Sequence, residues 1–486
     1  MRRGPLADRY WAAASMVVFA LVPYLALSAA IGPITPIIAR QLHMSRQTMA
    51  LASGMGNAAY AVGTVLAVQF AQHLPQRTMM LAYAALLVVG SVLAAAAQDP
   101  GMFIAGHVLQ GLSTSLLLIG AVPPLALGFG AERLRETAVI MNMGIFGAVT
   151  AGPVIGGLQA SAHGWRPLFW IIAGIAAASL LLALLTYEHQ PPADRSAPWD
   201  NAAVLLAAVG PAAAFYGASE LLTHRFLAPQ TVGPLLGGLA VIVLLVMYQY
   251  RTPRPLLIVR PMLGSTIPVA GVVIALFAAA ASVSVTQLTA SLQAGLYSPV
   301  HLGLLYLPEL GGAILTAVTL GLVIARWEMQ LLPLVGMIFL AAGIAIFRIE
   351  LPPGPGLTLI ASGVTGIGLG ATVAPALFAA GFSLPSASLQ RVFAIVELMR
   401  AVAAFMVAPV FAHFATDARS TGAALWVGFG FALGGAAIAV LIYLLGGARP
   451  ETPDLDAFTG GEAPAWHSPP LLDRVRKRRT ALQADR

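Results

Sequence analysis

The chain has 486 residues, of which 58% are hydrophobic and 9% charged, and its mean hydropathy is +0.84. No water-soluble domain of this size tolerates such a composition, so the sequence predicts a polytopic, all-α integral membrane protein. The absence of cysteine leaves no disulfide or thiolate metal site to invoke. Basic loops beside a membrane explain the net charge of +7, and no nucleic-acid partner is expected.

Apolar runs of about 20 residues, the length that crosses a bilayer, recur along the chain and predict fourteen spans. The first six are residues 11–32, 48–71, 78–97, 101–127, 138–160 and 167–187. Two more follow at 199–221 and 231–249, and the last six are 266–291, 300–324, 329–347, 356–380, 392–414 and 422–446. The first run is long and opens a series of similar runs, which favours an uncleaved span over a signal peptide.

Basic residues predict the orientation of these spans. With the N-terminus inside, nineteen of the 26 Lys and Arg residues lie in cytoplasmic segments and six in outer loops. This bias predicts that both termini are cytoplasmic, which requires an even number of spans. The tail is polar and Pro-rich from Gly447 and ends in a basic run at 474–479, which predicts a disordered segment drawn to anionic lipid.

The residues around the fifth span form a nearly bare helical face. As a helix, this stretch places small residues at strict i, i+4 spacing, and in lipid such a face lets another helix approach closely. Pro153 predicts a kink, because it removes the hydrogen bond to the carbonyl of Val149. We expect this face to join two halves of the protein. The residues involved are Gly144, Ala148, Gly152, Pro153, Gly156, Gly157 and Ala160.

An internal repeat relates the first and last six spans. Aligning Asn142 with Glu397 puts each segment after a loop that begins Gly-Phe and contains arginine, with a proline eleven or twelve residues on. Two homologous halves with a substrate site between them follow from this alignment. The predicted domains are a cytoplasmic N-terminus (1–10), an N-terminal six-helix bundle (11–187), a linker with two extra helices (188–265), a C-terminal six-helix bundle (266–446) and a cytoplasmic tail (447–486).

The sequence Gly152-Pro153-x-x-Gly156-Gly157, followed by GWRPLFW at 164–170, resembles the antiporter motif in the fifth span of major facilitator superfamily exporters. Residues 251–257 and 293–308 resemble the entry to the second half of the 14-span drug:proton antiporter branch, so the resemblance covers roughly residues 11–446. It implies the major facilitator fold, two six-helix bundles plus two extra helices, in a bacterial inner (plasma) membrane. The implied partners are a small-molecule substrate, protons and the lipid bilayer; a monomer is expected, and a periplasmic adaptor is left open.

Three positions depart from the family pattern. The loop between spans 2 and 3, which normally carries Gly, Asp and basic residues, reads QFAQHLPQR at 69–77 and keeps only Arg77 as a candidate cytoplasmic gate. The fourth-span motif has His107 in place of an arginine often assigned to proton transfer. Residues 26–36 of the first span contain no acidic residue, unlike many cation exporters of the branch.

Few ionisable residues lie at span centres, where a charge costs about 2.5–3.5 kcal/mol to insert. Glu309 follows Pro308 with no basic residue within a turn, and burial favours a carboxyl that takes up and releases a proton; the alternative is a carboxyl that faces a watery cavity. Glu397 and Arg400 at i, i+3 form either a structural ion pair or, if Glu397 faces the cavity, a second proton site. His107 either passes a proton or is a buried, hydrogen-bonded histidine.

Other polar residues of the spans either line a substrate cavity or bond across helices, and Gln110 and Asn142 rank highest because their spans usually border the cavity of this superfamily. The set is Asn57, Gln110, Asn142, Gln287 and Gln293. An adaptable apolar wall or ordinary lipid-facing packing explains Met141, Met143 and Phe146.

The chain has no Walker-type loop, HExxH motif or cysteine cluster, so we predict no enzyme activity, cofactor or metal. The sequence favours a proton-coupled exporter of lipophilic or amphipathic small molecules that works by alternating access. Two alternatives remain open: a proton-coupled importer of a metabolite, which the exporter motif disfavours, and a transport-inactive sensor or scaffold, which the eroded loop at 69–77 permits.

Overall fold

The computed structural model describes residues 4–188, 191–192 and 194–474. The N-terminal bundle contains α1 (Tyr10–Gln41), α2 (Arg46–His73), α3 (Gln76–Ala95), α4 (Pro100–Leu127), a composite fifth span and α7 (Arg166–Thr186). The fifth span runs through the 3-10 turn η1 (Ala131–Arg133), α5 (Leu134–Asn142), the π-helical η2 (Met143–Gly147) and α6 (Ala148–Ser161). The two extra helices are α8 (Asn201–Ser219), which continues into the 3-10 turn η3 (Glu220–Leu222), and α9 (Pro229–Arg251).

The second half begins after the short α10 (Val259–Leu263). The C-terminal bundle contains α11 (Thr266–Gln293), a span broken into α12 (Pro299–Leu305) and α13 (Leu307–Val323), the turn η4 (Trp327–Gln330), α14 (Leu332–Arg348) and α15 (Pro355–Phe382). The turn η5 (Ser386–Ser388), α16 (Leu389–Phe414), α17 (Ala418–Gly446) and the short α18 (Leu455–Gly460) complete the chain.

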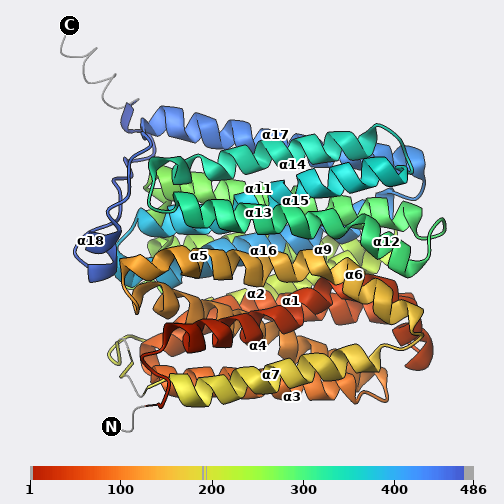
Figure 1. The fold of residues 1–486 in the computed structure, drawn as a ribbon, viewed down its shortest axis with the longest axis horizontal. Helices are drawn as coiled ribbons and strands as arrows, with labels where there is room; N and C mark the ends of the chain where they lie inside the picture. The colour runs from red at the N-terminus through yellow and green to blue at the C-terminus, as the bar shows by residue number, and fades with distance from the viewer. Residues whose placement is uncertain (1–3, 189–190, 193, 475–486) are drawn as a thin grey trace, which may run out of the picture.

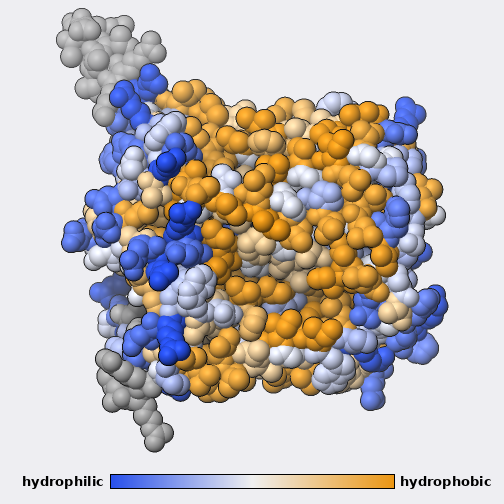
Figure 2. Space-filling view, in the orientation of Figure 1, coloured by the Kyte–Doolittle hydropathy of each residue, from blue (hydrophilic) through white to orange (hydrophobic). Residues whose placement is uncertain are grey.

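The long helices lie side by side, with both described termini at one end of the array (Figure 1). We call this end the termini side and the other the far side. On the face shown in Figure 2, apolar side chains cover the middle of the molecule and hydrophilic ones gather at both ends, as a bilayer requires. In the described part of the chain, thirteen helices are long and apolar enough to cross a membrane, and α14 is a shorter apolar helix of 17 residues.

Short polar residues begin several of these helices as the sequence leads one to expect. Ser45 and Asp99 accept hydrogen bonds from the backbone N–H groups of Thr48 (3.0 Å) and Met102 (2.9 Å). Asp417 and Ser420 form a reciprocal capping box at the start of α17, and the backbone and hydroxyl bonds from Ser420 lower the pKa of Asp417. These caps fix where the spans meet water.

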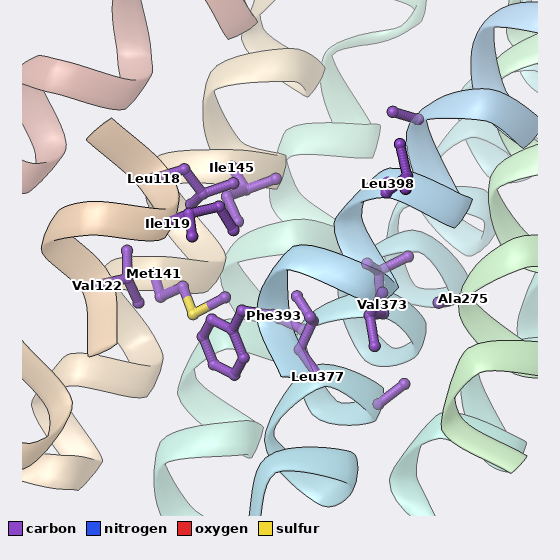
Figure 3. Packing of buried hydrophobic residues seen from close by; sticks show 14 of the residues in the cluster. Leu118, Ile119, Val122, Met141, Ile145, Ala275, Val373, Leu377, Phe393 and Leu398 are labelled. Carbon is purple, nitrogen blue, oxygen red and sulfur yellow. The ribbon is translucent and has the colours of Figure 1, made fainter. Parts of the chain in front are cut away.

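Two contact zones join the bundles. In the first, the fifth span packs against α12 and α13, and we call it the glycine seam; in the second, α2 packs against α16, and we call it the ionic seam. Buried apolar side chains also bridge the bundles, and Figure 3 shows Met141 of α5 beside Phe393 of α16. The labelled side chains around them are Leu118, Ile119, Val122, Ile145, Val373, Leu377 and Leu398.

The bare face of the fifth span does not lie where the sequence predicts. Methyl groups on Gly152 and Gly156 would collide with Ala29 and Ala30 of α1, so these two residues pack inside their own bundle and the prediction that they join the two halves is wrong. The prediction failed because helical spacing identifies residues on one face without identifying the helix opposite. The departure from α-helical geometry also falls at η2, before Pro153, which lies within the continuous α6.

The neighbouring face of the same helix makes the contact between bundles. A methyl group on Gly157 would collide with the carbonyl oxygen of Pro299, and one on Gly303 would lie 2.7 Å from the carbonyl oxygen of Pro153. Towards the termini side, Gly321 of α13 meets Val139 of α5. Close backbone approach therefore closes the glycine seam on the far side, and the side chain of Val139 packed on Gly321 closes it on the termini side.

Residues 454–471 fold against the termini side, where Phe458 and Trp466 are buried. The disordered tail that composition predicts is therefore wrong for this segment. Most of the basic run, residues 475–479, lies outside the described residues.

Candidate functional site

A buried ionic cluster joins the bundles at the ionic seam. Glu397 and Arg400 of α16 pair through Arg400 Nε and Nη2, which lie 2.9 and 2.6 Å from Glu397 Oε2. The hydroxyl of Tyr60, from α2, donates to the same oxygen at 3.0 Å and accepts from Arg400 Nη2 at 3.3 Å. We call these three residues the triad. Glu397 and Tyr60 are each 1% exposed, so the cluster is shielded from lipid and water.

The triad leaves one carboxylate oxygen without a partner. All three donors converge on Glu397 Oε2, while Glu397 Oε1 is buried and has no hydrogen-bond partner among the described residues. A buried oxygen that lacks a donor costs free energy, whereas the Arg400 guanidinium and the Tyr60 hydroxyl stabilise the other oxygen. The two oxygens of this carboxylate therefore have different surroundings.

Aromatic and amide side chains extend the triad into the N-terminal bundle. The ring of Tyr24 is nearly parallel to that of Tyr60, with centroids 6.2 Å apart, and lies 5.4 Å from the ring of His107. The hydroxyl of Tyr24 donates to Asn57 Oδ1 at 2.9 Å. His107 also stacks on Phe103, at 6.0 Å. Two predicted residues, Asn57 and His107, thus lie in one group with the triad.

Glycines allow α2 and α4 to approach closely enough to form this group. A methyl group on Gly56 would lie 2.8 Å from the ring of His107, and one on Gly111 would collide with the carbonyl oxygen of Gly56. Gln110 Nε2 donates to Ser91 Oγ at 3.1 Å, which ties α4 to α3. His107 and Gln110 are neighbours on α4 and both are buried.

Asn142 makes a separate contact at the end of α5, beside the glycine seam. Its Nδ2 donates to the carbonyl oxygen of Gly370 in α15 at 3.1 Å, so a neutral amide links the bundles there. The π-helical η2 begins at the next residue, and such turns often mark functional sites. This contact and the triad are the side-chain hydrogen bonds that link the two bundles in the described part of the chain.

Glu309 lies in the C-terminal bundle, away from the triad's hydrogen bonds. Its span breaks at Tyr306, and Glu309 occupies the first turn of α13, where unpaired N–H groups favour a negative charge. The side chain is 4% exposed and has no hydrogen-bond or ion-pair partner among the described residues. Its backbone touches Gly366 of α15.

The remaining cavity candidates are not brought to the triad. Gln293 is buried and donates to the carbonyl oxygen of Pro353 and to Thr358 Oγ1, both at 2.8 Å, while its Oε1 accepts from the hydroxyl of Tyr306 at 3.0 Å. These bonds lie within the C-terminal bundle and fasten α11 to α15 on the far side. Gln287 of α11 is exposed.

Arg77 caps a helix of its own bundle. Its Nη1 and Nη2 donate to the carbonyl oxygens of Tyr187 (3.2 Å) and Leu184 (3.3 Å) at the end of α7. Among the described residues, Arg77 makes no hydrogen bond to the C-terminal bundle.

Residues 69–73, where the family pattern is lost, instead hold the linker that leads into the extra helices. The ring of His73 stacks on Trp199 at 4.2 Å, and its Nε2 lies 2.9 Å from the carbonyl oxygen of Ala197. Gln69 Oε1 accepts from the backbone N–H of Asp200 at 2.9 Å. Gln69 and His73, which the structure places in the last turns of α2, therefore hold the segment that leads into α8.

The extra helices cover the ionic seam. Helix α8 contacts both α2 and α16, and α9 packs on α8. Phe405 of α16 lies between Phe215 of α8, at 6.1 Å, and the ring of Tyr60, at 6.5 Å, so an apolar layer separates the triad from the outside. Two bonds fasten η3 on the far side: Gln47 Nε2 to Glu220 Oε1 (2.9 Å) and His413 Nδ1 to the carbonyl oxygen of Leu221 (2.7 Å).

Sequence reasoning missed Tyr60 and Tyr24, because a neutral hydroxyl in an apolar run carries none of the insertion penalty that identifies charged residues. The only available signal was the placement of Tyr60 after Gly56 and Asn57, where small and polar residues indicate a helix face packed against other helices. Among the described residues, no group of three or more His, Asp or Glu side chains could hold a metal ion.

Two helical bundles with ionisable groups buried between them define a multi-pass membrane transporter. The Major Facilitator Superfamily model matches residues 16–327. The chain belongs to the Major Facilitator Superfamily, which confirms the fold predicted from the antiporter-like motif.

Three curated relatives have similar sequences. "Uncharacterized MFS-type transporter YubD" of Bacillus subtilis is 26% identical over 280 residues, covering 54% of this chain and 53% of the relative. "Multidrug resistance protein B homolog" of Mycobacterium tuberculosis is 27% identical over 293 residues (59% and 54%), and "Drug efflux pump JefA" of the same organism is 27% identical over 302 residues (60% and 58%). The matched region thus spans just over half the length of these relatives.

Solved structures show the same fold. The crystal structure of the peptide transporter POT in complex with sulfate has a TM-score of 0.62 and 16% sequence identity, and the match covers 90% of this chain and 94% of that one.

Proposed function

We propose that the protein is a secondary active exporter that moves lipophilic or amphipathic small molecules out of a bacterial cell in exchange for protons. The observation that carries this proposal is the triad, a carboxylate and a guanidinium buried between the bundles and bonded across them. The relatives named for drug efflux and the exporter-type sequence of the fifth span support the direction of transport.

Proton transfer at Glu397 would change the contact between the bundles. With the carboxylate charged, the bonds from Arg400 and Tyr60 to Oε2 are charge-assisted and therefore strong. A proton on Oε1 removes that charge, so both bonds weaken and the hydroxyl of Tyr60 can leave α16. Protonation would thus release the ionic seam, and deprotonation would restore it.

Two further groups are proposed to act with the triad. His107 lies in the aromatic group that includes Tyr60, and we propose that its ring passes a proton towards the interface. The carboxyl of Glu309 is buried and has no side-chain partner among the described residues. We propose that it is a second proton-binding site, in the C-terminal bundle. Asn57, Gln110 and Asn142 remain the proposed polar contacts of the substrate, with Gln287 and Gln293 as peripheral candidates.

The proposed substrate class follows from the interface chemistry. The side chains that bridge the bundles around Met141 and Phe393 are apolar, and Glu397 is already paired with Arg400. A lipophilic or amphipathic molecule suits this surface better than a polycation, which would need unpaired carboxylates.

Proteoliposomes containing the purified protein and a lipophilic fluorescent dye test the coupling. An imposed pH gradient is expected to drive dye movement in the native protein, and Glu397→Gln, whose side chain cannot take up a proton, is expected to abolish that response. Glu309→Gln is expected to weaken it. Dye movement that ignores the gradient, and is the same in native protein and both variants, would exclude proton coupling through these residues.

We also propose that both termini face the cytoplasm of the inner membrane, as the distribution of basic residues predicts. The sequence contains no cysteine, so single substitutions report on topology without background. Ser298 on the far side and Ser196 on the termini side are both exposed. In cells whose outer membrane has been permeabilised, a maleimide that cannot cross the inner membrane is expected to label Ser298→Cys and to leave Ser196→Cys unlabelled. The reverse labelling would invert the assigned orientation.

A further inference from the structure

The C-terminal segment at residues 454–471, which we call the strap, folds across the termini side. It includes α18 and buries two aromatic side chains: Phe458 is fully buried and Trp466 is 4% exposed. Burial of a large aromatic side chain removes enough apolar surface from water to hold a short segment in place. The strap is therefore a packed part of the structure.

The first anchor of the strap is the end of α15. The rings of Phe458 and Trp466 lie 4.9 and 5.7 Å from the ring of Phe382, both close to perpendicular to it. Trp466 Nε1 donates to Ser383 Oγ at 2.7 Å, and the backbone N–H of Ala465 donates to the carbonyl oxygen of Phe382 at 2.8 Å. The indole N–H of Trp466 and the backbone N–H of Ala465 thus both have hydrogen-bond partners, as buried donors require.

The second anchor is the beginning of α11, which has no side-chain cap of its own at Ser265. The strap supplies that cap: the backbone N–H groups of Thr266 and Ile267 donate to the carbonyl oxygen of Pro469 (2.9 Å) and to Ser468 Oγ (3.0 Å). Because the first N–H groups of a helix have no partner within it, these bonds tie the strap to the C-terminal bundle.

The strap also reaches the other bundle. Its helix α18 packs against η1, the turn that joins α4 to the fifth span of the N-terminal bundle. Figure 1 shows α18 at the termini side, next to the beginning of that span. The strap has two anchors on the C-terminal bundle and a smaller contact on the N-terminal bundle. When the bundles separate on the termini side, the contact between α18 and η1 is therefore the first to break.

We propose that the strap is a built-in brake that holds the termini side of the transporter closed, by fixing α18 against η1 until the bundles rock apart. Opening of the far side leaves this contact intact, whereas opening of the termini side must break it. The strap thus biases the protein against the state that opens to the termini side. The proposal rests on the alternating access contained in the proposed function, but neither on protons nor on a particular substrate.

Distances between spin labels on the two bundles test this brake in the full-length protein, without substrate or gradient. Thr78→Cys with Ala325→Cys reports on the termini side, and Ala162→Cys with Ala294→Cys on the far side; all four positions are exposed. The release variant combines Phe458→Ala with Trp466→Ala. His467→Ala is the matched control, because this exposed strap residue has no side-chain partner among the described residues.

In the release variant, the population with a long label-to-label distance on the termini side is expected to rise about fivefold or more relative to the population with a short distance. On the far side, the population with a short distance should gain. His467→Ala is expected to leave both ratios unchanged. A chain that ends at Pro453 lacks the whole strap, including its bonds to α15 and α11, and should reproduce the release variant. Distances that stay the same in both the release variant and the shortened chain would overturn the proposal. Because no gradient is applied, that result would leave proton coupling untouched.

Discussion

The two seams between the bundles are built from different chemistry. At the glycine seam, Gly157 and Gly303 let backbones meet, and the neighbouring polar link is the neutral amide of Asn142. At the ionic seam, a carboxylate, a guanidinium and a tyrosine hydroxyl form a buried cluster. The described side-chain link at the glycine seam is neutral, whereas the ionic seam contains the carboxylate on which the proposed proton coupling rests.

The internal repeat makes this difference informative. Asn142 and Glu397 occupy aligned positions of the two halves, and each makes a side-chain contact across the interface. The same position therefore carries an amide in one half and a titratable carboxyl in the other. We infer that the bundles rock on the glycine seam and that protonation controls the motion from the ionic seam.

The largest effect is expected from removing the cation of the ionic seam. Arg400→Met leaves Glu397 buried without its counter-charge, which should lower the free energy of unfolding by about 3–5 kcal/mol. Glu397→Gln added to Arg400→Met removes the uncompensated charge and should restore most of that loss. Denaturant unfolding in detergent measures both, and equal stabilities of the single and double variants would contradict a buried ion pair.

A side chain placed in the glycine seam should block transport with a smaller effect on stability. Gly303→Leu inserts atoms where even a methyl group would lie 2.7 Å from the carbonyl oxygen of Pro153, so it should cost about 1–3 kcal/mol and prevent closure of the far side. Gly311→Leu is the control, because a methyl group there meets nothing within 4 Å. Dye transport in proteoliposomes separates the two, and normal transport by Gly303→Leu would show that this seam need not close tightly.

Tyr60→Phe should weaken the ionic seam alone. Loss of the hydroxyl removes the hydrogen bond that it donates to Glu397 and the longer one that it accepts from Arg400, and the first of these gives an expected coupling of about 1.5 kcal/mol between Tyr60 and Glu397. A double-mutant cycle with Glu397→Gln measures this coupling. Tyr24→Phe, which loses only a bond to Asn57 within its own bundle, should show none. If Tyr24 and Tyr60 show equal coupling energies with Glu397, the hydroxyl of Tyr60 makes no specific bond between the bundles.

The smallest effect is expected at Asn142. Asn142→Ala loses one neutral bond to Gly370, which should lower the free energy of unfolding by about 0.6 kcal/mol, a typical value for an interhelical bond in a membrane. Asn142→Asp sharpens the comparison, because it gives the neutral contact a titratable group. Its stability should become pH-dependent while that of Asn142→Ala does not, as thermal unfolding across a pH series would reveal.

The sequence by itself determined the spans and the pair within α16. Span length follows from bilayer thickness, so the predicted runs fall on helical segments: thirteen in the described part are long enough to cross a membrane, two of them interrupted, and α14 is shorter. Glu397 and Arg400 pair because residues at i, i+3 lie on one helical face. Both results depend on interactions local in sequence, which periodicity and composition record.

Only the tertiary structure decided which helix each face meets. It turned Gly152 and Gly156 towards α1, brought Tyr60 to Glu397, and folded Phe458 of the tail onto α15. Helical spacing shows which residues share a face, but the partner of that face depends on how all the helices pack together. A neutral hydroxyl or a small residue leaves no mark in the sequence that names its partner, and the glycine face, the triad and the strap therefore became known only from the assembled fold.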